Sequence, residues 1–254
     1  MVRGLDTFRT WFDGYSDSYI IIGGTACDAA LSDAGFTARA TKDIDIILII
    51  EALSESFVAH FWDFVKAAGY QRCEQEMEKR HAYRFLNPSA STFPIQIELF
   101  SRKPDALVLP TSLHITPIPV EEGLSSLSAI LLNDDYYNFT LQHSTLADSI
   151  HYADVAALIC LKAYAYLSNK KLKESGINIH SINIDKHKND VFRLLPLLPP
   201  NAKIVLPESI YVDMQAFAET IKNNIPEHQV LINAGFRGLS PETLFQNLLA
   251  IFRL

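Results

Sequence analysis

Residues 19–51 constrain the fold of this chain more than any other stretch of the sequence. They open with the apolar run Tyr-Ile-Ile-Ile, which is typical of a short buried strand. A Gly-Gly-Thr turn and a helical pattern follow, and a second apolar run occupies residues 44–50. This order predicts two buried strands joined by a helix.

Two aspartates, Asp43 and Asp45, lie at the start of the second strand. Successive side chains of a strand point to opposite faces, so the two carboxylates share one face, about 7 Å apart along the strand. Two like charges in an apolar setting require a cation between them or contact with water. Because Mg²⁺ prefers hard oxygen ligands, a divalent metal ion is the simplest explanation.

Gly23, Gly24 and Thr25 lie where the first strand meets the helix. Glycines let the backbone come close to a ligand, and the free N–H groups at the start of a helix favour a phosphate. Thr25 adds a hydroxyl donor, which is also suited to capping the helix. A phosphate-binding turn beside a metal-binding Asp-x-Asp indicates phosphoryl or nucleotidyl transfer.

The chain reads Gly-Gly-Thr-Ala at residues 23–26 and Arg-Ala-Thr-Lys-Asp-Ile-Asp at residues 39–45. This combination resembles the polymerase-β-type nucleotidyltransferase superfamily and, within it, the AbiEii-like toxins of bacterial type IV toxin–antitoxin systems. The motif of that group is a Gly-Gly/Ser-Ser/Thr turn followed by Arg-x-Ser/Thr-x-Asp-φ-Asp, where φ is apolar. The glycine pair or the Asp-x-Asp alone would be a weak signal, whereas the combination is specific.

A third carboxylate, Glu98, lies in residues 93–100, whose alternation predicts a strand. The alternation places Ile97 and Leu99 on one face and Glu98 on the other. In the resembled enzymes a later strand brings a third acid beside the Asp-x-Asp strand, and Glu98 has the place expected for it. The alternative is an exposed glutamate on an edge strand.

The second half contains a lysine, Lys162, within an apolar helix predicted at residues 153–168. A buried lysine is costly unless an anionic group meets it, whereas a lysine that reaches the surface along its alkyl stem is a common alternative. In the resembled group such a lysine faces the nucleotide phosphates, and an acidic segment follows on the next helix. Asp190 matches the second acid of that segment, on the polar side of its predicted helix, and His187 takes the place of the first. The resemblance thus implies a nucleotide site formed by Gly23, Gly24, Thr25, Thr41, Lys162 and Asp190.

The resemblance implies a metal-dependent nucleotidyltransferase, which moves a nucleoside monophosphate from an NTP to a hydroxyl group and releases pyrophosphate. Asp43 and Asp45 are expected to hold two Mg²⁺ ions, and Glu98 to hold the ion nearer the attacking hydroxyl and to act as its base. Two ions about 4 Å apart would stabilise both the attacking and the leaving oxygens of an in-line displacement.

The acceptor stays open. The resemblance implies an RNA acceptor such as the 3′ end of tRNA, a toxin role and an antitoxin protein as partner. The net charge of −7, from 22 basic and 29 acidic residues, gives no support to broad nucleic-acid binding. One alternative is transfer to a small-molecule hydroxyl, as in antibiotic-modifying enzymes. Another is a degenerate domain that binds a nucleotide or a partner protein without catalysis.

The expected fold class is α+β, with a nucleotidyltransferase-type mixed sheet flanked by helices and a mostly helical C-terminal domain. The proline-rich residues 101–120 favour a catalytic domain at 1–120 and a helical domain at 121–254. Three scattered cysteines predict neither a disulfide framework nor a zinc site. Their pattern and the absence of a long apolar run lead us to expect a cytoplasmic protein that does not enter a membrane.

Helical periodicity also predicts a helix at residues 51–68, ahead of two strands at 70–73 and 82–86. The stretch 134–146 is ambiguous between helix and strand. The helices predicted in the second half, besides the one that holds Lys162, are 125–132, 186–195, 207–223 and 241–252.

Overall fold

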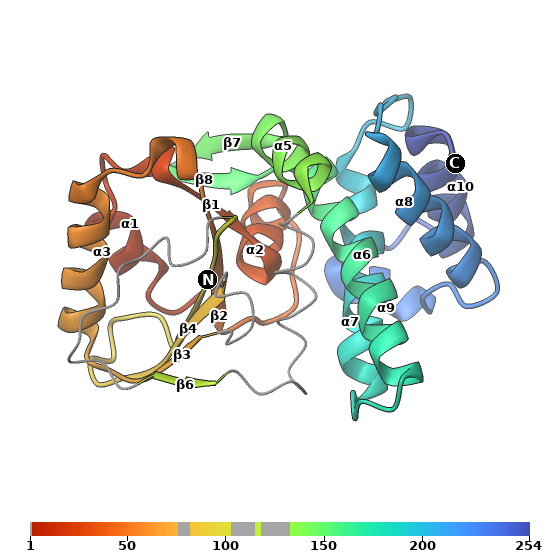
Figure 1. Ribbon diagram of the computed structural model, residues 1–254. Helices are drawn as coiled ribbons and strands as arrows, with labels where there is room; N and C mark the ends of the chain where they lie inside the picture. The colour runs from red at the N-terminus through yellow and green to blue at the C-terminus, as the bar shows by residue number, and fades with distance from the viewer. Residues whose placement is uncertain (1, 76–81, 103–114, 118–132) are drawn as a thin grey trace. The chain divides into compact units, whose positions relative to one another are not determined.

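The computed structural model describes residues 2–75, 82–102, 115–117 and 133–254 (Figure 1). The chain forms two compact units that interleave along the sequence. Unit 1 comprises Met1–Thr25, Ala40–Leu132 and Ser144–Ala153. Unit 2 comprises Ala26–Arg39, Asn133–His143 and Asp154–Leu254. The boundary expected between residues 120 and 121 lies outside the described residues, as does the helix expected at 125–132.

Unit 1 is built on one mixed sheet. Its described strands are β1 (Tyr19–Ile22), β2 (Asp43–Leu48), β3 (Tyr70–Gln75), β4 (Ala82–Pro88), β5 (Gln96–Phe100), β6 (Ile115–Pro117), β7 (Ser144–Ala147) and β8 (Ile150–Ala153). They lie in the order β6-β3-β4-β5-β2-β1-β8-β7, in which β2 pairs with β5, β1 with β8 and β3 with β6 in parallel. The other neighbours are antiparallel, so β2 lies at the centre with β1 on one side and β5 on the other.

The α+β class that the sequence predicts is confirmed. Strand β1 forms at the predicted residues, and β2 begins one residue before the predicted start. Besides its two aspartates, β2 consists of three isoleucines and one leucine, all buried. This composition suits a central strand, which has a neighbour on each edge and packs its apolar side chains into the core.

Helices α1 (Leu5–Trp11) and α3 (Glu55–Ala68) cover one face of this sheet (Figure 1). Ring contacts hold them together, with the Phe8 and Phe64 centroids 5.9 Å apart, and Phe61 reaches Phe85 of β4 at 5.5 Å. Helix α3 begins with a Ser54 side-chain cap and ends at Gly69 in the left-handed conformation, which glycine adopts without steric cost. This aromatic layer forms much of the core of unit 1.

Helix α2 (Gly23–Asp33) follows β1 directly and runs from unit 1 into unit 2. The other helices of unit 2 are α5 (Asp134–Gln142), α6 (Val155–Glu174), α7 (Ser181–Leu194), α8 (Glu208–Ile221), α9 (His228–Ala234) and α10 (Pro241–Phe252). Short 3₁₀ turns lie at η1 (Ser16–Ser18), η2 (Ile50–Ala52) and η4 (Leu195–Leu197).

Helix α6 is the centre of unit 2 and packs against α7 and α8 (Figure 1). It is apolar around most of its circumference, which is typical of a buried helix. Its N-terminus is capped by Asp154, whose carboxylate accepts a hydrogen bond from the Ala157 N–H at 3.0 Å. Among the described residues, no helix has both the length and the apolar character needed to cross a membrane.

The helices predicted in unit 2 form with shifted ends. Helix α10 has the predicted bounds, α6 continues to Glu174, and α7 begins five residues earlier than predicted, at Ser181. The ambiguous stretch becomes α5 up to Gln142 and then strand β7. Helix α9 was not predicted, because it is only seven residues long.

Candidate functional site

The three predicted catalytic carboxylates lie on adjacent strands of unit 1. Asp45 of β2 is the register partner of Glu98 on β5, and Asp43 is the partner of Gln96. Register partners on neighbouring strands point to the same face and lie about 5 Å apart. The structure therefore brings Asp43, Asp45 and Glu98 together on one face. The two aspartates are partly exposed, whereas Glu98 is buried.

The glycine pair makes room for side chains of this same site. A Cβ atom on Gly23 would lie 1.7 Å from Asp45 Oδ2, and one on Gly24 would lie 2.6 Å from Thr41 Oγ1. Gly23 also has a φ of +69°, which disfavours any residue with a side chain. The glycines thus allow the backbone to approach Asp45 and Thr41 closely, and the predicted approach of a phosphate to the same turn stays a prediction.

Thr25 links this turn to the carboxylate strand. Its side chain is fully buried, and its hydroxyl donates a hydrogen bond of 2.6 Å to the backbone carbonyl of Asp43. The hydroxyl hydrogen is therefore already in use and is not available to a phosphate. Thr25 fixes the first turn of α2 to the start of β2, which positions Asp43.

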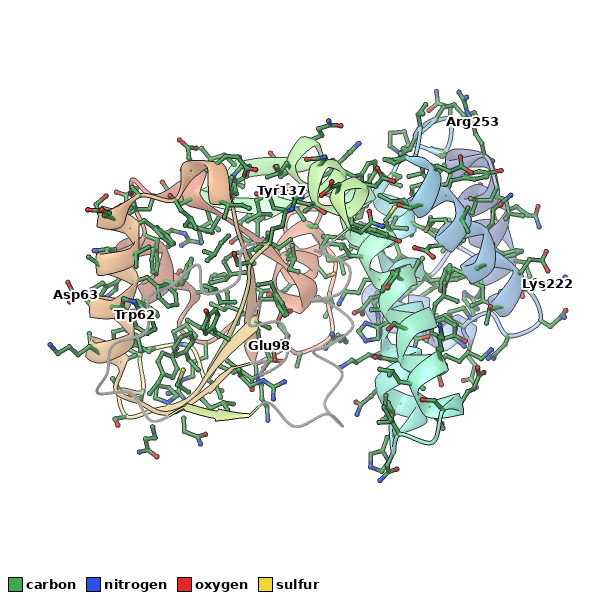
Figure 2. The ribbon with its side chains drawn as sticks, viewed as in Figure 1. Trp62, Asp63, Glu98, Tyr137, Lys222 and Arg253 are labelled. Carbon is green, nitrogen blue, oxygen red and sulfur yellow. The ribbon has the colours of Figure 1, made fainter. Side chains whose placement is uncertain are left out.

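Glu98 is held by two neighbours on the sheet. Arg84, its register partner on β4, donates from Nε to Glu98 Oε1 at 3.1 Å, and Gln96 donates from Nε2 to the same oxygen at 2.6 Å. The arginine is 4% exposed and the glutamate 8%. Figure 2 shows Glu98 beside the strands of unit 1.

Burial raises the pKa of Glu98 to about 8, the nearby Asp45 adds to the rise, and Arg84 opposes it. The arginine therefore compensates only part of the negative charge at this end of the sheet. A cation bound here would relieve the remaining repulsion between the carboxylates.

The carboxylates of this site match the expected Mg²⁺ only in part. Among the residues that the structure describes, no group of three or more His, Cys, Asp and Glu side chains is arranged to hold a metal ion. Asp43 and Asp45 nevertheless offer two hard oxygen donors on one face, and Mg²⁺ in phosphate-transfer sites is usually held by one or two carboxylates and the substrate phosphates. The pair therefore fits an ion that arrives with a nucleotide. The hydrogen bonds that Glu98 accepts from Arg84 and Gln96 both go to Oε1.

Unit 2 contains a second buried carboxylate, Asp190 of α7, which is surrounded by cations. Arg39 Nε lies 3.0 Å from Oδ2, Lys162 Nζ lies 3.2 Å from Oδ2, and Arg193 Nη1 lies 2.9 Å from Oδ1. The prediction that Asp190 lies on the polar side of its helix is wrong, because its side chain is only 3% exposed. These cations make that burial tolerable. Lys162 is buried, and its ammonium group forms an ion pair with Asp190.

Burial alone would raise the pKa of Asp190, but Lys162, Arg39 and Arg193 lower it below its ordinary value. Asp190 is therefore ionised, and both its oxygens accept from cationic donors. An ionised carboxylate has no donor to offer a phosphate. Asp190 thus holds Lys162 and Arg39 in place, and any contact with a phosphate falls to these cations.

His187, at the place of the first acid of the family segment, does not take part in these ion pairs. Its Nε2 lies 3.2 Å from Asn169 Nδ2, and its buried Nδ1 has no hydrogen-bond partner among the described residues. Burial, with the positive charges of Lys162 and Lys186, lowers the pKa of His187 well below its ordinary value. The imidazole is therefore neutral near pH 7 and is not a stand-in for an aspartate.

Sequence reasoning missed Arg84 as a neighbour of the site and Arg39 and Arg193 as partners of Asp190. The partner of Arg84 depends on the register of β4 against β5, which no local pattern reveals. Arg39 was recognised as part of the motif, but its partner lies 151 residues away in the sequence. Only Arg193 could have been recognised from the sequence as a partner of Asp190, because it is three residues away on the same helix.

No protein-family model matches this chain, and no curated protein matches it either. The functional assignment therefore depends on the residues and on the geometry described above.

Proposed function

We propose that the chain is a metal-dependent nucleotidyltransferase with an α+β catalytic unit of the nucleotidyltransferase type. The observation that carries the proposal is the row of Asp43, Asp45 and Glu98 on one face of the sheet, next to the glycine turn at the start of α2. Carboxylates in this number and at this spacing serve no packing purpose, since their mutual repulsion costs stability unless a cation is bound.

Asp43 and Asp45 would hold Mg²⁺, which supplies charge neutralisation at the phosphates of a bound NTP. The hydroxyl oxygen of the acceptor forms a bond to the α-phosphorus, and the bond from that phosphorus to the bridging oxygen of the β-phosphate breaks. Pyrophosphate leaves, and the hydroxyl proton passes to Glu98. Gly23 and Thr25 set the position of the aspartates that this displacement requires.

Lys162 stays a prediction as a phosphate contact. Asp190 holds this buried lysine and the partly exposed Arg39, and a cation whose position is fixed loses little entropy when an anion binds. The role of Asp190 is to orient these cations.

The proposal is tested by incubating the purified protein with Mg²⁺, bulk tRNA and each NTP labelled either at the α- or at the γ-phosphate. Nucleotidyl transfer predicts that only the α-label reaches an acceptor. Asp43→Asn and Asp45→Asn should each abolish the transfer, because each removes one of the two proposed cation ligands. Asp63→Asn is the matched control, since Asp63 is exposed on α3, far from Glu98 in Figure 2.

The same experiment identifies the acceptor. Label on tRNA would support an RNA acceptor and the toxin interpretation, with an antitoxin protein as the expected partner. If NTP binds but tRNA stays unlabelled, addition of small hydroxyl compounds tests the antibiotic-type alternative. Transfer retained by either asparagine variant would contradict the assignment of the carboxylates. Absence of nucleotide binding would favour a degenerate domain that serves a partner protein.

A further inference from the structure

The C-terminal end of helix α6 carries positive charge that the proposed reaction does not use. Lys170, Lys171 and Lys173 lie there, and the chain then passes through residues 175–180 into α7, which packs against α6 (Figure 1). Residues 155–193 hold seven lysines and arginines against three acidic residues, although the whole chain has a net charge of −7. Positive charge is therefore concentrated on one pair of helices of an acidic protein.

The three lysines form one patch at the surface of unit 2. Lys171 and Lys173 are exposed, and Lys170 is partly exposed. At about 100° per residue, their side chains span roughly 160° of the helix circumference. Lys173 Nζ donates a hydrogen bond of 2.5 Å to Ser181 Oγ, which extends the patch to the start of α7. We call residues 170–184 the hairpin end; its exposed neutral polar side chains include Ser175, Asn178, His180 and Ser181.

The lysines of the hairpin end are not neutralised by carboxylates. Within the part of the chain that the structure describes, none of the three forms an ion pair, and Glu174 pairs with none of them. By contrast, Lys188 and Lys222 each pair with a carboxylate three residues earlier on the same helix. Cations suit the end of a helix, but lysines three residues apart repel each other. A row of anionic groups would relieve this repulsion.

The composition of the hairpin end favours RNA over other anionic partners. Protein interfaces are enriched in arginine and depleted in lysine, whereas this stretch has three lysines and no arginine. A helix that lies on a membrane exposes an apolar face, but the apolar residues of α6 are mostly buried, and Ile182 is the one large apolar side chain largely exposed in the hairpin end. Lysines among neutral hydroxyl and amide groups are typical of contacts to phosphates and sugars.

We propose that the hairpin end binds the sugar–phosphate backbone of an RNA acceptor, with Lys170, Lys171 and Lys173 as the phosphate contacts. The inference rests on the proposed function in taking RNA as the acceptor of the nucleotide. Because these contacts go to the backbone, the surface does not select a sequence. A local patch of this kind lets a chain with a net charge of −7 bind RNA.

The affinity is measured by the fluorescence anisotropy of labelled bulk tRNA titrated with the whole protein in the absence of NTP. The triple variant Lys170→Gln, Lys171→Gln, Lys173→Gln should bind about tenfold more weakly or worse at about 0.1 M salt. The slope of log affinity against log salt concentration should fall by about two to three, because each lost phosphate contact removes roughly 0.7–0.9 from it. Glutamine keeps the helix propensity of lysine, and circular dichroism verifies the fold.

The matched control is the triple variant Lys203→Gln, Lys222→Gln, Arg253→Gln, which removes the same charge from other exposed positions of unit 2. Figure 2 shows Lys222 and Arg253 away from the end at which α6 and α7 are joined. Because exposed charges beyond about 10 Å are largely screened at this salt concentration, the control should bind tRNA within about threefold of the wild type. If the first triple variant does not fold, Lys171→Gln alone should weaken binding by about twofold or more.

Equal weakening by the two triple variants would overturn the proposal, because binding would then depend only on net charge. Wild-type affinity in the folded Lys170, Lys171 and Lys173 variant would overturn it as well. So would a wild-type protein that binds phosphatidylserine vesicles but no tRNA, since the surface would then serve a membrane.

Asp43→Asn separates this inference from the proposed function. The variant should bind tRNA at least as tightly as the wild type while it transfers no nucleotide. If the wild type transfers nucleotide to a small hydroxyl compound and does not bind tRNA, the inference fails and the proposed function stands. If Asp43→Asn still transfers nucleotide, the proposed function fails, and the comparison of the two triple variants still decides whether the hairpin end binds RNA.

Discussion

Glu98 in unit 1 and Asp190 in unit 2 are both buried carboxylates that accept from arginine, yet their pKa values move in opposite directions. Burial raises the pKa of Glu98, and the acidic neighbours on its face of the sheet add to the rise. Asp190 has three cationic neighbours, and its pKa is lowered. The difference shows that burial raises the pKa of a carboxylate unless nearby cations outweigh it.

This contrast also separates two kinds of role. The charges around Asp190 are complementary, which is typical of a group that stabilises the fold and holds other side chains in place. The charges around Glu98 are not complementary, and functional sites commonly retain such a local cost because a ligand relieves it. We therefore expect removal of the two carboxylates to change stability in opposite directions.

The largest effect is expected for Asp190→Asn. The change keeps the size of the side chain but leaves Lys162, Arg39 and Arg193 without their shared counter-charge. Breaking a buried ion pair from one side costs about 3–5 kcal/mol, so the free energy of unfolding should fall by about that amount. Urea unfolding followed by circular dichroism measures it.

Glu219→Gln provides the control for this variant, because Glu219 pairs with Lys222 on the exposed side of α8. Its loss should cost less than about 1 kcal/mol. Equal losses in the two variants would contradict the role of Asp190 as a buried anchor.

A smaller effect is expected from His187, which lies beside the same cations. The unfolded chain binds a proton at this residue near pH 6.5, whereas the folded protein does not. The free energy of unfolding should therefore fall as the pH drops below 6.5, by up to about 1.4 kcal/mol per pH unit until the folded-state pKa is reached.

Replacing His187 by Gln should flatten this part of the pH profile, and urea unfolding between about pH 7 and pH 5 measures the slope. His228→Gln is the control, because His228 is exposed at the start of α9. An unchanged slope in the His187 variant would show that this imidazole is not held neutral by burial.

An effect of opposite sign is expected for Glu98→Gln. The folded-state pKa of about 8 lies above the ordinary value of 4.5, so the folded protein binds more protons between these values and Glu98 lowers stability as the pH rises through that window. The variant removes this titration, so it should raise the free energy of unfolding at neutral pH by an amount that grows by up to about 1.4 kcal/mol per pH unit across the window. It should also abolish transfer.

Chemical unfolding of the wild type and of the Glu98 variant at two pH values on either side of neutrality measures the change in stability, and the assay with labelled NTP measures the loss of transfer. Glu55→Gln on the exposed first turn of α3 should change stability by less than about 0.5 kcal/mol. A loss of stability in Glu98→Gln would mean that the ion pair with Arg84 outweighs the repulsion from Asp45.

Local patterns in the sequence predicted those features that depend on neighbours along the chain. The apolar run at Tyr19–Ile22 and the alternation around Glu98 predicted strands, and the position of Asp43 and Asp45 on a shared face follows from strand periodicity. The role of the glycines was predicted only in part, because the side chains that lie against them, Asp45 and Thr41, come from a later segment.

Features that depend on register or on distant partners could not be predicted in this way. The contact of Arg84 with Glu98 requires the alignment of β4 with β5, and the burial of Asp190 requires that Arg39 and Lys162 meet it. A single aspartate on an amphipathic helix is usually exposed. The burial of Asp190 can therefore be inferred only from a structure that shows the cations that compensate its charge.

The central claim is that Asp43 and Asp45 together bind the cation that accompanies a nucleotide. Anomalous diffraction from a crystal grown with Mn²⁺ and a non-hydrolysable NTP analogue tests it most directly. We predict a Mn²⁺ peak at about 2.1 Å from a carboxylate oxygen of each aspartate and from a phosphate oxygen. A bound nucleotide whose metal ion contacts neither aspartate would contradict the account.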